Sequence, residues 1–378
     1  APLIKSWSKA SRKQLVGLTM KLLGLKASPN ALIILNDWME TAPNGMYKRA
    51  AWEAFRQAAI RKGLSIEELA DQIIPDFGFN RQGEKRVDYG TRTFRVTLMP
   101  DFSISVLDLD KQKVSKSLPA PLKSDDREKA ENARAEQASL KKRVKTQTNI
   151  QKRRLEQSLK NGRTWPKEAW LATFIENPVM RYIATGLIWG VYKEGKLQDS
   201  FRYLEDGTFT TADEKEFLLP DNAVISLVHP IDLPDETLAG WKEQLDDYEL
   251  IPFIPQLSAP VHRLTETEKR GDTLLRYSGK KVYLSNIYEF ETADITTRIE
   301  NNTLHIIDRS LNVVAQLSFV YEESDCFLKE LYFSSVEEGE DINTIQLPKE
   351  ERLPLSSIPE RFISTLLDIL NRAFPLNE

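Results

Sequence analysis

The sequence is poor in several features that mark whole classes of protein. Among its 378 residues Cys326 is the one cysteine, which excludes a disulfide within the chain and a cysteine-based zinc site. No run approaches the roughly 18 apolar residues of a membrane-spanning helix, and no signal-peptide pattern opens the chain. We therefore expect a cytoplasmic protein without a membrane partner. Because a helical pattern starts almost at Ala1, we also expect this chain to be the C-terminal part of a longer protein.

Residues suited to metal and cofactor chemistry are equally scarce. The three histidines, His229, His262 and His305, lie far apart in the sequence, whereas zinc needs clustered ligands. No glycine-rich phosphate loop occurs, and residues 193–196 (Lys-Glu-Gly-Lys) fit a hairpin turn instead of a nucleotide-binding loop. The sequence therefore predicts no metal, no cofactor and no catalytic residue that a motif would identify.

The charges are unevenly distributed, although the composition is ordinary. Hydrophobic residues make up 41% and charged residues 29%, with a net charge of −4, as in typical globular proteins. Residues 111–160 hold 15 Lys and Arg against 6 Asp and Glu, a net +9, whereas residues 204–260 hold 2 against 13, a net −11. The two blocks either attract each other within one molecule or leave the basic block available to nucleic acid.

Residues 1–74 are predicted to be helical. Three helices are expected between Ser11 and Lys62, because leucines and alanines recur there at helical spacing. A further short helix is expected after Ser65, since the segment Ser65 to Glu68 has the pattern of a capping box. Short helices joined by tight turns resemble the end of a HEAT-type solenoid.

The next two segments are a β-hairpin and a long helix. Residues 75–124 contain a hairpin, in which alternating residues 93–98 and 104–107 form the two strands, followed by a proline-containing linker. Residues 125–162 hold a stretch that runs from the capping aspartates to about Lys160, contains neither Pro nor Gly, and predicts one long helix. This helix is interpreted either as a solvated bridge between domains or as a nucleic-acid arm, whose candidate contacts are Lys141, Lys142, Arg143, Lys145, Lys152 and Arg153.

Residues 163–264 are predicted to form a mixed α+β unit, called the hub below. Aromatic residues lie on short extended runs, and Glu194-Gly195 and Asp206-Gly207 are turn dipeptides. The candidate ligand- or partner-binding residues of the hub are Trp189, Tyr192, Arg202, Asp206 and His229.

Two of these candidates have competing interpretations. Arg202 lies between two aromatic residues and suits a carboxylate or phosphate ligand, but it would equally suit an ion pair with Glu205 or Asp213. Arg202, Asp206 and His229 together would make an acid/base surface for an enzyme, but Asp206-Gly207 is also what a hairpin turn requires by itself. Both alternatives stay open at this point.

Residues 265–378 are predicted to form an antiparallel meander with a C-terminal helix. Strands are expected at 304–307, 313–320 and 327–333, and an acidic loop at 337–341. The final helix is expected to start after Ile358-Pro359.

An ordered set of short motifs resembles the bacterial DUF4132 family from about residue 63 onward, with a weaker likeness after Lys280. The motifs are Pro75-Asp76-Phe77-Gly78, Asp88-Tyr89-Gly90, Arg153-Arg154-Leu155-Glu156, Asn177-Pro178, Leu187 to Tyr192, Leu204 to Gly207, His229-Pro230, Asp247-Tyr248 and Pro255-Gln256-Leu257. Proteins of that family are sometimes labelled molybdate metabolism regulators and often carry HEAT-like repeats or a WGR domain. The resemblance implies no activity. A WGR domain in the hub is not expected, because Val191 follows Trp189-Gly190 where that motif has arginine.

The sequence as a whole predicts an α+β protein. Its expected parts are HEAT-like helices, a long bridging helix, a mixed central hub, and an antiparallel meander with a C-terminal helix. The first functional hypothesis is a non-catalytic protein-interaction or scaffold module, and the resemblance implies partners within a multi-component bacterial assembly of a regulatory or conflict-related kind. The alternatives are nucleic-acid binding through residues 141–154 and an enzyme at the surface of Arg202, Asp206 and His229.

Overall fold

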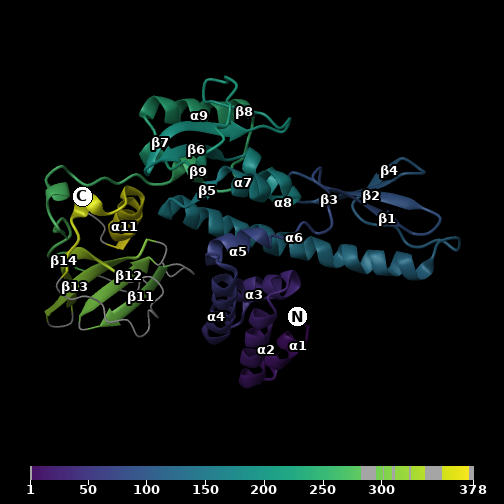
Figure 1. Cartoon of the computed structure of the whole chain (residues 1–378), viewed down its shortest axis with the longest axis horizontal. Coiled ribbons are helices and arrows are strands. Elements are labelled where there is room, and N and C mark those ends of the chain that lie inside the picture. Colours follow the sequence, from purple (N-terminus) through teal and green to yellow (C-terminus); the bar gives the residue numbers. More distant parts are fainter. Residues whose placement is uncertain are drawn as a thin grey trace. The chain divides into compact units, whose positions relative to one another are not determined.

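A computed structural model of the chain describes residues 2–281, 295–300, 302–308, 311–322, 325–336 and 351–373. It has the α+β fold class predicted from the sequence, with three antiparallel sheets among the described residues (Figure 1). The chain divides into two compact units, each built from two stretches: residues 1–153 with 166–185, and residues 154–165 with 186–378. The five ranges predicted from the sequence stay predictions.

The first unit begins with a group of short helices: α1 (Pro2–Lys9), α2 (Lys13–Lys26), α3 (Pro29–Thr41), α4 (Gly45–Lys62) and α5 (Ile66–Gln72). Helices α2 to α4 are the three predicted between Ser11 and Lys62, and the predicted capping box at Ser65 and Glu68 starts α5. Their core is apolar and includes Leu35, Phe55 and Leu69. The resemblance of these helices to HEAT repeats stays a prediction.

A four-stranded antiparallel meander follows in the same unit: β1 (Glu84–Asp88), β2 (Thr93–Leu98), β3 (Ile104–Asp108) and β4 (Lys113–Ser115). The predicted hairpin is the central pair β2 and β3, and the structure adds one strand on each side. Phe94, Val96 and Leu98 alternate into a buried face, which packs on Leu140 and Val144 of α6 (Arg127–Asn161) and on Val179 of α8 (Pro178–Thr185). The long helix is therefore anchored by one apolar side over its first half.

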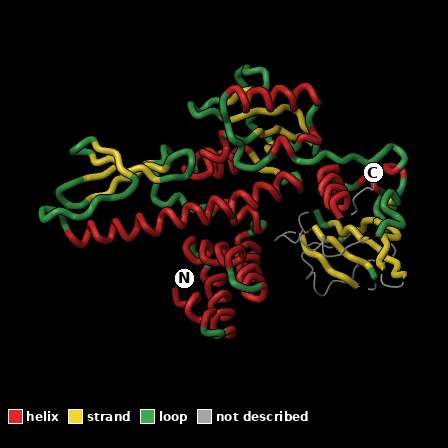
Figure 2. Tube along the Cα trace, turned by 180° about the vertical axis from the view of Figure 1, so that it is seen from behind, coloured by secondary structure: helices red, strands yellow, loops and turns green. Residues whose placement is uncertain are grey.

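Helix α6 is a single element of 35 residues, as predicted, and is drawn as one unbroken helix in Figure 2. Asp126 caps it by accepting a hydrogen bond from the Lys129 amide at 3.0 Å. Trp165 and Pro166 form the end of strand β5 (Thr164–Pro166), where Trp165 packs edge-on against Trp189 with ring centroids 6.1 Å apart, and Pro166 is also the N-cap residue of the helix that follows. Helix α7 (Lys167–Trp170) and the π-helical turn η1 (Leu171–Glu176) follow.

The hub of the second unit is a five-stranded sheet with strand order β5-β9-β6-β7-β8. Its further strands are β6 (Ile188–Lys193), β7 (Lys196–Tyr203), β8 (Phe209–Thr210) and β9 (Val224–Leu227). The predicted two-residue turn between β6 and β7 is confirmed, because Glu194 and Gly195 both have the positive φ that such hairpins need. Helix α9 (Asp235–Asp247) packs Trp241 and Leu245 against Ile188 of the central strand.

The C-terminal sheet of the same unit has the order β10-β14-β13-β12-β11. Its strands are β10 (Thr273–Leu274), β11 (Ile295–Glu300), β12 (Thr303–Asp308), β13 (Val313–Glu322) and β14 (Asp325–Ser335). The three predicted strands are β12 to β14, and the predicted final helix is α11 (Glu360–Ala373), whose Phe362, Leu366 and Leu370 face the core of this sheet. The predicted acidic loop at 337–341 lies outside the described residues.

Candidate functional site

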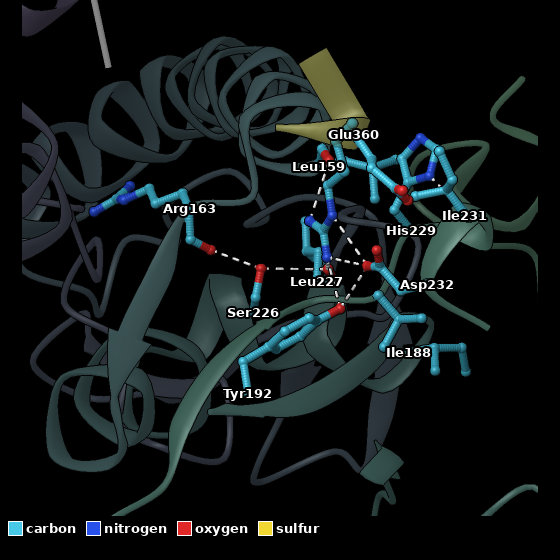
Figure 3. Close-up of polar contacts among 12 residues, drawn as sticks. Leu159, Arg163, Ile188, Tyr192, Ser226, Leu227, His229, Ile231, Asp232 and Glu360 are labelled. Carbon is cyan, nitrogen blue, oxygen red and sulfur yellow. Dashed lines mark hydrogen bonds and ion pairs between the residues drawn. The ribbon is translucent and has the colours of Figure 1, made fainter. Parts of the chain in front are cut away.

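A buried arginine of the C-terminal helix is the centre of a polar network that includes three residues of the hub. Arg361 donates hydrogen bonds from all three of its nitrogens: from Nε to Asp232 at 3.0 Å, from Nη2 to the Tyr192 hydroxyl at 2.6 Å, and from Nη1 to the Leu159 carbonyl at 3.3 Å. Nη2 also reaches the Leu227 carbonyl at 3.0 Å. Figure 3 labels the four partners, Leu159, Tyr192, Leu227 and Asp232, and marks these contacts as dashed lines. We call these five residues the arginine network.

The network joins Arg361 of α11 to residues of four other elements. Tyr192 comes from β6, Leu227 ends β9, Asp232 lies in the short 3₁₀ turn η2 (Pro230–Asp232), and Leu159 belongs to the last turn of α6. The Tyr192 hydroxyl also donates to Asp232 at 2.8 Å. A buried guanidinium is tolerated only when its donors and its charge are matched. Each of the three side-chain nitrogens of Arg361 has a hydrogen-bond partner within the fold, so the network serves to hold these elements together.

His229, a predicted binding residue, lies beside this network and is only 3% exposed. Its Nδ1 accepts a hydrogen bond from the Ile231 amide at 3.0 Å. Burial and the positive charges of Arg361 and Arg263 lower the pKa of His229 to about 4, against the opposing effect of Asp232. The imidazole is therefore neutral at neutral pH, and its Nδ1 is already used by the backbone.

Tyr192 titrates outside the physiological range. Burial raises the pKa of Tyr192 well above its usual value, and the charge of Asp232 adds to this, although Arg361 acts in the opposite direction. A phenol that stays protonated and donates to a carboxylate is a hydrogen-bond donor, not a base.

Trp189 and Asp206, two further predicted binding residues, both make contacts within the fold. Trp189 is the second residue of β6 and is fully buried. Asp206 is exposed, and its Oδ1 accepts hydrogen bonds from the amide and hydroxyl of Thr208 at 2.9 and 2.7 Å. These bonds to Thr208 lower the pKa of the Asp206 carboxyl. The Asp206 carboxylate thus stabilises the turn that its sequence predicted.

Arg202 has a partner other than those expected. Its Nε donates to Gln244 of α9 at 2.9 Å, and its guanidinium lies 5.3 Å from the ring centroid of the exposed Tyr248. The predicted ion pair with Glu205 or Asp213 is wrong, because Asp213 pairs with Lys215 and the carboxylate that acts on Arg202 is that of Glu214. Burial lowers the pKa of Arg202. The physical reason is that Arg202 points to the helix-covered face of the sheet, where amide and aromatic groups replace a carboxylate.

The structure does not bond the three residues of the enzyme alternative to one another. Arg202 contacts α9, Asp206 closes a turn, and His229 accepts a backbone amide. Among the residues that the structure describes, no group of three or more His, Cys, Asp or Glu side chains is placed to hold a metal ion.

All six nucleic-acid candidates are exposed, and five of them share one face of α6. Lys141, Lys142, Lys145, Lys152 and Arg153 are exposed on α6, and at 100° per residue they fall within an arc of about 120°. We call these five residues the basic face. Arg143 points elsewhere and lies 5.0 Å from the ring centroid of Phe77.

Few of the cations on the basic face have a partner. Arg153 pairs with Glu40 at 3.0 Å, and Lys141 donates to the Lys116 carbonyl at 2.8 Å. Within the described part of the chain, no carboxylate lies at ion-pair distance from Lys142, Lys145 or Lys152. The basic face therefore keeps most of its charge available to solvent and to an anionic partner.

Two clefts of the described part of the chain have lining residues that are already paired with each other or with neighbours. A cleft of about 340 Å³ lies between β1 and α6, but its acids are already paired, Asp88 with Lys129 and Glu136 with Lys85. A second cleft of about 200 Å³ borders Arg263 and Glu360, which pair with each other. Neither is an apolar pocket with a few unmatched polar groups, the usual form of a small-molecule site.

Sequence reasoning missed Arg361 and Asp232, although it named Tyr192 and His229 beside them. Asp232 follows a buried strand by a few residues, and a lone acid in the run from Ala223 to Leu233 was a weak signal of a buried ion pair. Arg361 sits in the first turn of an amphipathic helix and had no signal at all.

Comparison with known proteins identifies relatives of this chain. Residues 113–293 match the model of a family described as a domain of unknown function, DUF4132. A 288-residue region is 30% identical to the uncharacterized protein YehI of Escherichia coli strain K12; it covers 75% of this chain and 24% of that protein. The chain thus spans about a quarter of the length of this relative. No solved structure matches the chain. Among the described residues, no helix combines the length and the apolar character needed to cross a membrane.

Proposed function

We propose that this chain is a non-catalytic interaction module within a protein of the DUF4132 type. The observation that carries this proposal is the commitment of the hub's polar groups. Tyr192 and Asp232 are bonded to Arg361, the His229 Nδ1 accepts a backbone amide, and Asp206 closes its own turn. A general base must be able to reach a substrate proton, and these groups are held by the fold instead. Partners are expected to be proteins of a multi-component assembly.

Affinity capture followed by reconstitution tests this function. The chain is used as bait in an extract of its source organism, and each reproducible partner is purified and titrated against the chain by calorimetry. The expected result is a saturable complex of fixed stoichiometry in which the partner is chemically unchanged, as checked by intact mass. Capture of no reproducible protein, or conversion of the partner by the wild-type chain but not by His229→Asn, would contradict the proposal.

Nucleic-acid binding along α6 is a second candidate function, favoured by the unpaired cations of the basic face. From Lys141 to Arg153 the face extends about 18 Å, at 1.5 Å per residue. This length matches about five successive phosphates of one strand. Because Lys142, Lys145 and Lys152 pair with no described carboxylate, phosphate binding would not require breaking an internal ion pair at those three positions.

A salt titration with matched charge variants tests this second function. Labelled mixed-sequence duplex DNA and single-stranded RNA are the probes, and fluorescence anisotropy is the readout. For the duplex we expect the logarithm of the affinity to fall with the logarithm of salt with a slope of about −4. The variant K142Q/K145Q/K152Q should reduce that slope by about 3.

The matched control removes the same number of charges from exposed lysines of the hub, K193Q/K196Q/K242Q. It should leave affinity and slope unchanged. Equal losses in both triple variants would mean that only net charge matters, and absent or salt-independent binding would end the nucleic-acid hypothesis.

A further inference from the structure

Helix α2 has an apolar side that the fold leaves uncovered. Its inner side is buried through Val16 and Met20. Its outer side carries four leucines that are 40%, 55%, 55% and 67% exposed in chain order and that we call the leucine seam: Leu15, Leu18, Leu22 and Leu25. Exposed apolar side chains gathered on one face mark an interaction site more often than scattered ones do.

The spacing of the leucine seam specifies the shape of what covers it. Its steps are three, four and three residues, which is the a and d pattern of a coiled coil. Such a seam is narrow, whereas a helix that lies against a broad apolar surface shows a wider stripe. The leucine seam therefore fits a single helix laid along α2.

The flanks of the seam specify the charge of the partner helix. With Leu15 in an a position, Lys21 takes a g position and Lys26 an e position, and both are exposed. The other flanking residues, Gln14 and Thr19, are uncharged. No acidic residue precedes Asp37 in the sequence. Because e and g side chains select partners by charge, the flanks favour Glu or Asp on the facing helix.

A second copy of α2 does not satisfy these flanks. In a parallel pair Lys21 would face Lys26 of the other copy, and in an antiparallel pair each lysine would face its own equivalent. Like charges across such a seam disfavour pairing.

We propose that the leucine seam of α2 docks an amphipathic helix of a partner protein, with apolar a and d positions and acidic e and g positions. This inference rests on the proposed interaction function and names the chemistry of one partner segment. The seam spans about three helical turns. This area is small, so affinity is expected in the micromolar range typical of short helix-in-groove contacts.

Two synthetic helical peptides of three heptads, about 21 residues each, probe the seam. Both carry Leu at a and d; one carries Glu at every e and g position and the other Lys, so that self-repulsion keeps each peptide monomeric. Binding to the full chain is measured by fluorescence anisotropy. The acidic peptide should bind at least about tenfold more tightly than the basic one, a difference of about 1.4 kcal/mol.

Three variants separate the seam from unspecific binding. L18E/L22E should lose at least tenfold in affinity for the acidic peptide, and K21E/K26E should reverse the preference so that the basic peptide binds more tightly. The matched control L218E/I251E changes two apolar residues that are 79% and 92% exposed in the other compact unit, and it should bind like the wild type. Circular dichroism confirms that each variant is folded.

Several outcomes would contradict the proposal that the leucine seam docks an acidic helix of a partner protein. Equal binding of both peptides, or acidic-peptide binding that persists in L18E/L22E, removes the predicted selectivity. Self-association of the wild type that L18E/L22E abolishes would assign the seam to a second copy. Sedimentation with vesicles of phosphatidylcholine and phosphatidylglycerol, abolished by the same variant, would assign it to lipid.

Failure of the proposed docking site can be distinguished from failure of the proposed interaction function. If a partner captured with the wild-type chain binds L18E/L22E as tightly as wild type, the seam is wrong for that partner and the interaction function stands. If no partner is captured at all, the interaction function itself is contradicted, whatever the peptides do.

Discussion

Two regions of this molecule use positive charge in opposite ways. In the arginine network, Arg361 is 8% exposed and donates hydrogen bonds to a carboxylate, a phenol and two carbonyls. On α6, the lysines of the basic face are exposed and largely without carboxylate partners. A buried charge must be matched by the fold, whereas an exposed charge contributes little to stability. The buried charge of Arg361 therefore supports the fold, whereas the exposed charge on α6 is available to bind a partner.

The largest expected effect is the removal of the arginine network. Arg361→Met keeps an apolar stem but leaves Asp232 and two carbonyls without their donor, so we expect the free energy of unfolding of the second unit to fall by about 3 to 5 kcal/mol. Urea unfolding gives the total, and hydrogen exchange of the β6 and β9 amides locates the loss in the hub.

An exposed pair is the control for this prediction. Arg372 and Asp368 form an ion pair on the same helix, and the side chain of Arg372 is 61% exposed. Arg372→Met should cost less than about 1 kcal/mol. The double variant R361M/D232N should lose less than the sum of its single variants, because the two residues interact directly. If Arg361→Met lowered the free energy of unfolding as little as Arg372→Met does, the distinction between buried and exposed charge in this protein would be wrong.

An intermediate effect is expected from pH, through His229. Its pKa in the folded chain is about 4 and its ordinary value is 6.5, so the unfolded chain binds more protons between these pH values. Stability therefore rises with pH in this window and is lost as pH falls from about 6.5 toward 4. His229 alone should account for about 2 kcal/mol between pH 7 and pH 5.

His229→Asn isolates this contribution, because its side-chain oxygen can still accept the Ile231 amide but does not titrate. The pKa of His305 is also lowered to about 4, by burial, and it contributes equally to both proteins. The expected result is a shallower stability profile for the variant below pH 6.5. Parallel profiles would show that His229 keeps an ordinary pKa.

The smallest expected effect on stability is at the basic face. K142Q/K145Q/K152Q should change the free energy of unfolding by no more than about 1 kcal/mol, since each lysine is exposed and unpaired. The same variant is the one predicted to weaken nucleic-acid binding, so urea unfolding should separate recognition from folding. A larger loss of stability would mean that these lysines support the fold.

The sequence predicted the elements whose patterns are local. Helix α6 follows from an uninterrupted helical segment with capping aspartates, and the turn at Glu194 and Gly195 follows from its dipeptide. Strand β5 was not predicted, because the side-chain contact between Trp165 and Trp189 that it makes joins residues distant in sequence.

The candidate site was harder to predict, because its bonds span long separations. Arg361 lies 129 residues from Asp232 and 202 from Leu159 in the chain. Nothing in the local pattern around Arg361 distinguishes a buried guanidinium from an exposed one at a helix start. The exposure of the leucine seam was equally hidden, since helical spacing shows that the four leucines share a face but not whether that face is covered.

The missing side chain of Gly190 works as a spacer in the centre of β6. A methyl group there would press on the side chains of Leu197, Tyr192 and Val228, coming within 2.9 Å of the last two. Even alanine would thus push the Tyr192 ring, and with it the hydroxyl that meets Arg361. In a saturation library we expect position 190 to tolerate no residue other than glycine, with the damage appearing first as a loosened C-terminal helix.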